Sequence, residues 1–425
     1  MIKSVRGMHD ILPDQMYYWQ YIYRTAASIL DTANYQEIRT PIVESQSLFM
    51  RSIGENTDII NKELYSFNDR SSRDLVLRPE GTAGIARAIL EHGLCDQQTV
   101  QKLWYLGPMF RYERPQQGRQ RQFHQLGIEC YGSQSTVLDA EIIYLAHRVL
   151  KELKCQSLSI EINSIGNYKE RQIYENDLKE YLNNYIHDLD KETLHKLQAN
   201  ALRLLDSKNP KIQEILLEAP KLTNYLEIES KQRFEEVKDH LHTLGIKFET
   251  NNQLVRGLDY YNDTVFEIKN TELGAQNTLC GGGRYDGLTK QLGGKLIHAM
   301  GWGIGIERLL ILIQQQINIA SKKICFYIAC QSNEDQFYAL NLIPMIHEYK
   351  LKYELDLSGR GLKKQIQQAI KKNSVICLII GKNEITQRTI LIKWLNTKEQ
   401  QTCSLDNFKN ILPVIANKYQ KLIEN

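Results

Sequence analysis

The spacing of apolar residues predicts a helix and then a strand near the start of the chain. Apolar side chains recur at helical intervals over residues 19–33, and a β-branched run interrupted by a proline follows at residues 38–43. Another strand is expected at residues 74–78, and a helix at residues 83–92 behind Thr82, whose hydroxyl is suited to cap it.

An antiparallel hairpin is expected next. Strand-like patterns cover residues 102–112 and 123–131, and a long basic loop that contains Pro115 and Gly118 separates them. This hairpin holds more polar and charged positions than any other strand-like part of the chain.

Strand alternation groups the polar residues of the hairpin. Successive side chains of a strand point to opposite faces, so Arg111 and Glu113 should share one face. The same rule puts Gln125, Gly127 and Glu129 on one face of the returning strand. Because glycine has no side chain, a glycine between two polar residues leaves open surface against which a ligand can lie. The alternative is a sheet with one wet face, where these groups only pair with neighbours, and the alternation leaves both open.

The remaining patterns divide the chain into two domains. Residues 168–242 are rich in charge and leucine and poor in glycine, which predicts a helical insertion, and glycine-rich strands return at residues 254–303. Strands and helices then alternate, as in a small α/β domain with a mainly parallel sheet. We expect a first domain at residues 1–321 and a second at residues 322–425, with a polar linker around residues 317–323.

Composition excludes several classes of protein. Of the 425 residues, 42% are hydrophobic and 24% are charged, which is ordinary for a globular chain. No apolar run approaches the roughly 18 residues that cross a bilayer, and no signal-peptide pattern opens the chain. We therefore expect a cytoplasmic protein without membrane contact. The eight cysteines lack a zinc-site spacing, so reduced thiols and no bound structural metal are expected.

Charge is distributed unevenly along the chain. Residues 322–425 carry 16 Lys and Arg against 9 Asp and Glu, whereas the first 321 residues carry 37 against 41. A local excess of positive charge suits a polyanionic partner. A solvated basic helix face would give the same count.

Four further segments combine an arginine or a carboxylate with glycine. They are R-P-E-G-T at 78–82, V-R-G-L-D-Y-Y at 255–261, C-G-G-G-R-Y-D-G at 280–287 and G-W-G-I-G-I-E-R-L at 301–309. Glycine lets the backbone approach a ligand closely, and guanidinium groups match phosphate oxygens. Together the segments indicate a nucleotide site. Their spacing matches neither a P-loop nor a dinucleotide-binding motif.

These motifs resemble those of a known family. The hairpin F-R-Y-E-R-P-Q-Q-G-R-Q-R-Q-F-H-Q-L-G and the segment G-I-G-I-E-R-L are similar to motifs 2 and 3 of class II aminoacyl-tRNA synthetases, and residues 38–44 are similar to motif 1. R-G-L-D-Y-Y and G-G-G-R-Y-D-G-L resemble the two signature peptides of the bacterial-type histidyl-tRNA synthetases. The likeness extends from residue 7 into the tail.

The resemblance implies a fold and an activity. The fold would be an α/β protein with an antiparallel-sheet class II core, a helical insertion and a C-terminal α/β anticodon-binding domain. The activity would be that of a histidine-tRNA ligase. It activates L-histidine with ATP and Mg²⁺ to histidyl-adenylate and pyrophosphate, and transfers histidine to the 3′ end of tRNA(His). A homodimer formed through motif 1 is also implied.

The resemblance also implies the residues that bind ATP. Arg111 is expected on the α-phosphate and Arg308 on the γ-phosphate, while Arg256 is expected where other class members use a metal ion. Glu113 and Arg119 are expected near the adenine and the phosphates. The reaction needs no side-chain nucleophile, so positioning and electrostatics would supply most of the catalysis.

Histidine would be held at both ends. The ammonium group is assigned to Glu80, Thr82 and Gln125. The imidazole is assigned to Glu129 and Tyr261, and Tyr260 is counted in the same site. Both imidazole nitrogens need a partner, and a carboxylate with a phenol can provide them while leaving an isostere poorly paired.

The resemblance extends to tRNA and leaves one paralogue to consider. Arg114 and Gln116, in the hairpin loop, are expected to read the acceptor end of tRNA(His), and the basic tail is expected to bind the anticodon. The regulatory subunit of ATP phosphoribosyltransferase shares the same core but senses histidine without catalysis. It generally lacks the tail and parts of the motifs, whereas Arg111, Arg256 and Arg308 are all present here. Another class II synthetase or ligase would require the signature peptides to be coincidental.

Overall fold

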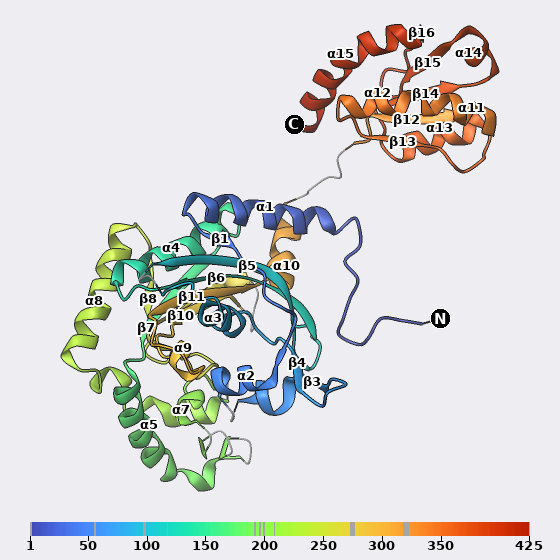
Figure 1. Ribbon diagram of the computed structural model, residues 1–425. Coiled ribbons are helices and arrows are strands. Elements are labelled where there is room, and N and C mark those ends of the chain that lie inside the picture. Colours follow the sequence, from blue (N-terminus) through green and yellow to red (C-terminus); the bar gives the residue numbers. More distant parts are fainter. Residues whose placement is uncertain are drawn as a thin grey trace. The chain divides into compact units, whose positions relative to one another are not determined.

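The computed structural model describes residues 2–424 apart from 55–56, 97–98, 117, 191–192, 195–196, 199, 208, 273–276 and 318–322. The chain forms two compact units, Met1–Ile319 and Ala320–Asn425 (Figure 1). The linker predicted around residues 317–323 falls largely on the last gap, outside the described residues.

An eight-stranded sheet is the centre of the first unit (Figure 1). In order across the sheet, its strands are β1 (Gln36–Glu37), β5 (Gln101–Phe110), β6 (Gln122–Tyr131), β11 (Ala299–Gly305), β10 (Thr278–Arg284), β9 (Asn262–Asn270), β7 (Leu158–Ser164) and β8 (Glu249–Thr250). The two edge pairs, β1 with β5 and β7 with β8, are parallel, and the other neighbours are antiparallel. The predicted hairpin is confirmed, and so is an antiparallel core.

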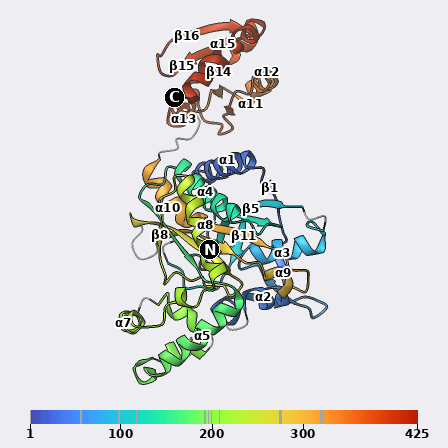
Figure 2. The same cartoon turned by 90° about the vertical axis from the view of Figure 1, so that its left-hand side faces the viewer.

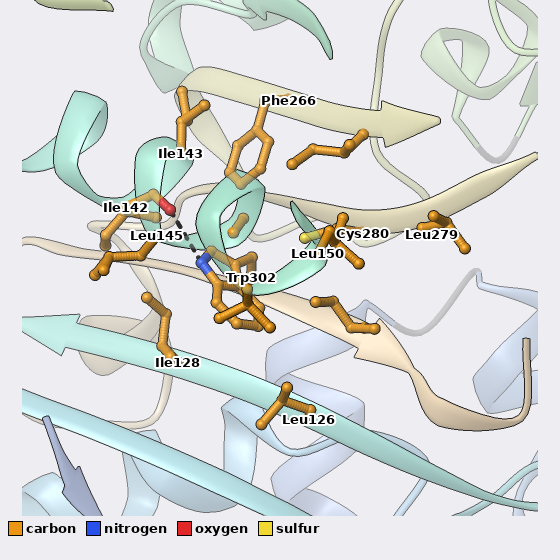
Figure 3. Packing of buried hydrophobic residues seen from close by; sticks show 14 of the residues in the cluster. Leu126, Ile128, Ile142, Ile143, Leu145, Leu150, Phe266, Leu279, Cys280 and Trp302 are labelled. Atoms are coloured by element: carbon orange, nitrogen blue, oxygen red, sulfur yellow. Dashed lines mark hydrogen bonds between the residues drawn. The ribbon is translucent and has the colours of Figure 1, made fainter. Parts of the chain in front are cut away.

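Helices with one apolar stripe cover one face of this sheet. They are α1 (Met16–Thr32), α4 (Thr136–Glu152), α8 (Ile228–Thr243) and α10 (Ile306–Gln316). Trp302 of β11 lies among their side chains, and its indole N–H donates to the carbonyl of Ile142 at 3.0 Å (Figure 3). Because side chains alternate along β11, the neighbours Gly301 and Gly303 point to the opposite face.

That opposite face packs against a second apolar cluster. β5 shows the division, since Trp104 belongs to the first cluster and Leu103 and Tyr105 belong to the second. The second cluster includes side chains of α3 (Thr82–Glu91), α9 (Leu288–Gln291) and the helical segment described next. A smaller, separate cluster joins α2 (Gln46–Ile53) and η1 (Ile59–Glu63) to a three-stranded sheet of β2 (Val43–Ser45), β4 (Asp74–Leu77) and β3 (Tyr65–Asn68).

The segment predicted as a helical insertion is helical where it is described. It holds α5 (Tyr168–Asn183), η2 (Ile186–Asp188), η3 (Ala201–Leu204), α7 (Pro210–Leu217), η4 (Leu222–Asn224) and α8. Figure 2 shows α5 and α7 at the end of the unit away from α1. The pair Asn209-Pro210 predicts a break in the helical pattern, and in the structure a new helix begins there. Asn209 accepts a hydrogen bond from the backbone N–H of Lys211 at 3.1 Å, and Pro210 occupies the first turn, where its missing N–H costs nothing.

The continuous strand predicted at residues 38–43 is wrong. β1 ends before it and β2 begins at its end, because the chain crosses here from the large sheet to the small one. Pro41 has no N–H to donate to a strand neighbour. The carbonyl of Thr40 accepts instead from Nη1 of Arg78 at 2.9 Å.

Thr82 does not cap the helix that it was expected to cap. α3 begins at Thr82 itself, and the carboxylate of Glu80 accepts from the backbone N–H groups of Thr82 at 2.6 Å and Ala83 at 2.8 Å. An acidic side chain can satisfy these exposed N–H groups as well as a hydroxyl can. The Thr82 hydroxyl is thereby left for a contact described below.

The second unit has a five-stranded sheet of mixed direction. Its order is β13 (Tyr353–Leu355), β12 (Phe326–Cys330), β14 (Ile376–Ile380), β15 (Thr389–Trp394) and β16 (Gln400–Ser404). β12 pairs in parallel with β13 and β14, but β15 is antiparallel to both of its neighbours, so the expectation of a mainly parallel sheet is wrong. β16 escaped prediction because its sequence, Q-Q-T-C-S, has no apolar alternation.

Five helices accompany this second sheet. They are α11 (Asn333–Leu340), α12 (Leu342–Glu348), α13 (Leu362–Lys371), α14 (Lys382–Gln387) and α15 (Leu405–Glu424). The spacing of apolar residues over 334–349 predicts one helix, but in the structure the chain breaks it in two at Asn341. Pro344 has no N–H for the carbonyl of Leu340, four residues earlier.

Membrane contact and cysteine state can be checked directly. No helix in the described ranges is long and apolar enough to span a bilayer. All eight cysteines are free thiols, and only Cys95 is more than slightly exposed.

Asp139 and Arg284 form a fully buried ion pair between α4 and β10. Nη2 of Arg284 lies 2.5 Å from Oδ1 of Asp139, and neither side chain is exposed to solvent. Arg284 also donates to the carbonyls of Ser133 and Ser135. Removing the Asp139 carboxylate would take away the nearer of two counter-charges, since Oδ1 of Asp286 lies 3.3 Å from Nη1 of Arg284.

We expect Asp139→Ala to lower the free energy of unfolding of the first unit by about 3–5 kcal/mol. Thermal or urea unfolding followed by circular dichroism measures the change. Glu152→Ala is the matched control, since it breaks a half-exposed pair with Arg148 on the same helix and should change stability little. Equal effects of the two variants would contradict the importance of the buried pair.

Candidate active site

Two adjoining cavities lie over the glycine-rich strands of the large sheet. They have volumes of about 310 and 200 Å³. The residues common to both linings are Arg111, Gln125, Arg256, Gly281 and Gly303. Ligands held in the two cavities would therefore meet at a shared wall that carries two guanidinium groups.

The larger of the two cavities is cationic. Its lining includes four arginines, Arg111, Arg119, Arg256 and Arg308, and the carboxylate of Glu113. Nη1 of Arg119 donates to Oε2 of Glu113 at 3.2 Å, and Nη1 of Arg308 donates to the carbonyl of Thr278 at 2.5 Å. Burial, together with the charge of Arg119, lowers the pKa of Arg308 below its usual value. A polyanion would relieve this mutual repulsion.

Arg256 is fixed from three sides. Its Nη1 pairs with Oε1 of Glu267, and its guanidinium carbon lies 5.7 Å from the centre of the Tyr261 ring. On the third side it lies so close to Gly281 that any Cβ there would overlap the guanidinium. Since Glu267 is the residue paired with Gly281 across β9 and β10, one rung of the sheet supplies both contacts.

Arg111 lies just past the end of β5 and not on a strand. The expectation that Arg111 and Glu113 share a strand face is therefore wrong, because pairing of the hairpin strands ends at Phe110. The two side chains still lie within ion-pair range, with 3.9 Å between Nη1 and Oε1. Nε of Arg111 donates to the carbonyl of Pro79 at 2.9 Å, which aims the guanidinium over the ring of Phe123.

The smaller cavity is lined by polar groups and tyrosines. Glu80, Thr82, Gln125, Tyr260 and Tyr261 all contribute to its wall. The predicted common face of Gln125, Gly127 and Glu129 is confirmed. Gln125 and Glu129 lie against Gly303 and Gly301 of β11, and Gly127 lies against the ring of Tyr105, which bonds Gln125 on the same face. The Gln125 amide packs on Gly303, and its oxygen accepts from the Tyr105 hydroxyl at 2.9 Å.

Glu129 lies beneath this cavity and does not line it. Its side chain is almost fully buried, and its carboxyl accepts from the Thr82 hydroxyl at 2.7 Å and from the Tyr285 hydroxyl. Burial raises the pKa of Glu129 to about 8. Burial thus favours the protonated form of this carboxyl over a wider pH range than in an exposed glutamate.

Sequence reasoning missed the supports of these residues. Tyr285 was read only as part of a signature peptide, and Glu267, Tyr105 and Thr278 were not singled out at all. The Thr278 hydroxyl donates to Oε2 of Glu267 at 3.0 Å. This hydrogen bond orients the carboxylate, whose other oxygen pairs with Arg256. Strand alternation could have indicated Glu267, but only after the register of β9 against β10 was known.

Arg114 and Gln116 line neither cavity. Each side chain is exposed in the hairpin loop, and the backbone of Gln116 pairs with that of Arg119. Their assignment to a nucleic acid stays a prediction. A cavity of about 900 Å³ bounded by α2, α3 and residues 292–297 contains none of the predicted site residues. Over the described ranges, no cluster of His, Cys, Asp and Glu is suited to hold a metal ion.

Comparison with known proteins gives consistent matches along the chain. A family model described as histidyl-tRNA synthetase matches residues 7–309, and one described as anticodon binding domain matches residues 325–414. The chloroplastic histidine-tRNA ligase of Pyropia yezoensis is 48% identical, with 98% of this chain and 97% of that protein covered. The histidine-tRNA ligase of Cyanothece sp. is 47% identical, with 98% of each chain covered.

Solved structures agree with these sequence matches. The crystal structure of the apo histidyl-tRNA synthetase of S. aureus has a TM-score of 0.80 and 33% identity. The match covers 97% of this chain and all of that one. The antiparallel core and the second α/β unit are therefore those of a known architecture, as the sequence predicted.

The raised pKa of Glu129 predicts a particular pH dependence. Between about pH 4.5 and 8 the folded protein keeps a proton on Glu129 that the unfolded chain has released, so the free energy of unfolding falls as pH rises through this window. Glu129→Gln cannot ionise and should lose less stability than the wild type between about pH 6 and 8. Melting temperatures of both proteins across this range measure the difference, and parallel curves would show that Glu129 is ionised throughout.

Proposed function

Because the chain belongs to the histidyl-tRNA synthetase family, we propose that it activates L-histidine with ATP and then transfers histidine to the 3′ end of tRNA(His). The observation that carries this proposal is the shared wall of the two cavities, where Arg111 and Arg256 stand between a polyanion site and a small polar site.

In the first step, ATP occupies the cavity of about 310 Å³ and histidine the cavity of about 200 Å³. An oxygen of the histidine carboxylate attacks the α-phosphorus, the bond to the bridging oxygen breaks, and pyrophosphate leaves. Arg111 and Arg256 offset the repulsion between the two anions and the charge that grows on phosphorus. Arg308 and Arg119 hold the outer phosphates, and Glu113 orients the nucleotide. Their work is positioning and electrostatics.

Glu80, Thr82 and Gln125 hold the ammonium group of histidine. Burial raises the pKa of Glu129 beneath them, and the positive charge of the ammonium group would lower it again and favour the carboxylate. Tyr260 and Tyr261 form the wall for the imidazole. Tyr261 is the group of this wall that would bond one imidazole nitrogen, and Glu129 would reach the other only after leaving Thr82 or Tyr285.

Mg²⁺ is brought by ATP in this account. The four arginines fit the phosphates of the nucleotide, and the ion would be held mostly by phosphate oxygens and water, which is its usual preference. In the second step a ribose hydroxyl at the 3′ end of the tRNA attacks the histidyl carbonyl, and AMP leaves.

The tRNA would contact both units. Arg114 and Gln116 are exposed on the hairpin loop beside the ATP cavity and are assigned to the acceptor end. The tail carries the positive excess of the chain and matches an anticodon-binding family, so it is assigned to the anticodon. We accordingly assign catalysis to residues 1–321, with the insertion at about 168–242, and anticodon binding to residues 322–425.

A homodimer is the expected assembly. Ile42 and Val43 of the motif 1 segment are each about 40% exposed. Exposure of adjacent apolar side chains to water is unfavourable, and a second copy of the chain could bury them. The cytoplasm is the expected location. Relatives called chloroplastic make the plastid stroma the other compartment to test.

Pyrophosphate exchange with ATP and Mg²⁺ tests the activity. We expect exchange with histidine and with no other amino acid, and a loss of roughly 10²–10³-fold in Arg256→Ala, because one cation of the shared wall is removed. Arg148→Ala, on the outer surface of α4, is the control and should exchange normally. If histidine binds without any exchange, the chain is a histidine-sensing paralogue and not a ligase.

Binding of tRNA tests the role of the tail. Lys363 and Lys364 are exposed at the start of α13, and replacing both with alanine should raise the KM for tRNA several-fold at low salt, since each can contact a phosphate. Pyrophosphate exchange should not change. Lys151→Ala in the first unit is the control, and an equal effect of that variant would mean that the tail has no special role.

A further inference from the structure

The segment that carries the histidine tyrosines has little structure of its own. Residues 254–261 form neither helix nor strand, although they hold Arg256, Tyr260 and Tyr261. Of the backbone hydrogen bonds found in the described part of the chain, only one comes from residues 255–261, a long bond of 3.5 Å from the N–H of Asp259 to the carbonyl of Ile53. Side chains from elsewhere must therefore hold this segment in place.

Asp259 is the main attachment point of the segment. Its Oδ1 accepts from Nδ2 of Asn200 at 3.0 Å and from Nη2 of Arg203 at 2.9 Å. Both donors belong to the helical insertion, at η3. The other oxygen, Oδ2, lies so close to Gly54 that a Cβ there would overlap it. The Asp259 carboxylate thus contacts the insertion with one oxygen and the end of α2 with the other.

A second attachment lies at the other end of the segment. Nη1 of Arg171, on α5 of the insertion, donates to the carbonyl of Tyr261 at 2.5 Å. The two attachments bracket Tyr260, whose ring is tilted by 42° against that of Tyr261 at 4.6 Å between centres and packs edge-on against Tyr285. The insertion therefore contacts both ends of the stretch that forms the histidine wall.

Arg256 has separate supports. Glu267 and Gly281, which fix its guanidinium, belong to β9 and β10 of the sheet. The guanidinium of Arg256 is thus held by the sheet and by the ring of Tyr261, whereas the backbone around the two tyrosines is attached to the insertion.

We propose that the helical insertion positions the histidine-binding tyrosines through Asp259 and Arg171. This inference rests on the proposed function, because it assigns Tyr260 and Tyr261 to histidine. Asp259, Arg171 and Arg203 touch no substrate in this scheme and act as positioning residues. Loosening them should impair the binding of histidine far more than that of ATP, since Glu267 and Gly281 still hold Arg256 when the Tyr261 ring moves.

Pyrophosphate exchange with histidine and ATP varied separately provides the test. We expect Asp259→Ala and Arg203→Ala each to raise the KM for histidine about ten-fold, as expected for the loss of a charge-assisted hydrogen bond, with the KM for ATP within about two-fold of the wild type. Because the two residues act on one another, the double variant should be no worse than Asp259→Ala alone. Arg203→Lys, which keeps the charge, should recover part of the loss.

Lys211→Ala is the matched control, since it breaks an exposed pair with Asp188 inside the same insertion and should behave as the wild type. Arg171→Ala is the second variant if Asp259→Ala does not fold, with folding judged by the melting temperature. The inference is overturned if the folded variants keep the histidine KM of the wild type, or if the KM values for histidine and ATP rise together. Failure of the proposed function is distinct, because the wild type itself would then show no exchange.

Discussion

The position of Arg256 against a glycine floor is the constraint on which the site depends. A guanidinium can lie flat on β10 only because Gly281 has no side chain, and it stays there because Glu267, across the same rung, supplies the counter-charge. The shared wall of the two cavities is built from this contact together with Arg111, which the carbonyl of Pro79 aims. Both ligands must meet at this wall for the chemistry to occur.

The sheet carries this site by dividing its two faces sharply. On β11, Trp302 enters the helical core while Gly301 and Gly303 leave room on the other side for Glu129 and Gln125. Large side chains on the helix-covered face of the sheet therefore stabilise the core, and glycines on the opposite face leave room for the site. The buried pair of Asp139 and Arg284 attaches the end of β10 to α4. This contact helps to hold a strand whose glycines have no side chains to pack.

The sequence allowed much of this to be predicted, for specific reasons. Alternation along β6 put Gln125 and Glu129 on one face, and the glycine-rich segments indicated a phosphate site before any fold was known. The predicted strand at residues 38–43 was wrong, because the chain passes there from one sheet to another. The predicted parallel sheet of the tail was wrong, because the polar strand β16 carries no apolar pattern and forms only by pairing with β15. Glu267, Tyr285 and Asp259 act through contacts far apart in sequence, and no local pattern reveals such contacts.

A structure with a non-hydrolysable analogue of histidyl-adenylate tests the central claim most directly. We expect the imidazole in the cavity walled by Tyr260 and Tyr261, the adenosine in the cationic cavity, and the phosphate mimic between Arg111 and Arg256. Binding in the separate cavity of about 900 Å³, or a phosphate mimic out of reach of both arginines, would contradict it.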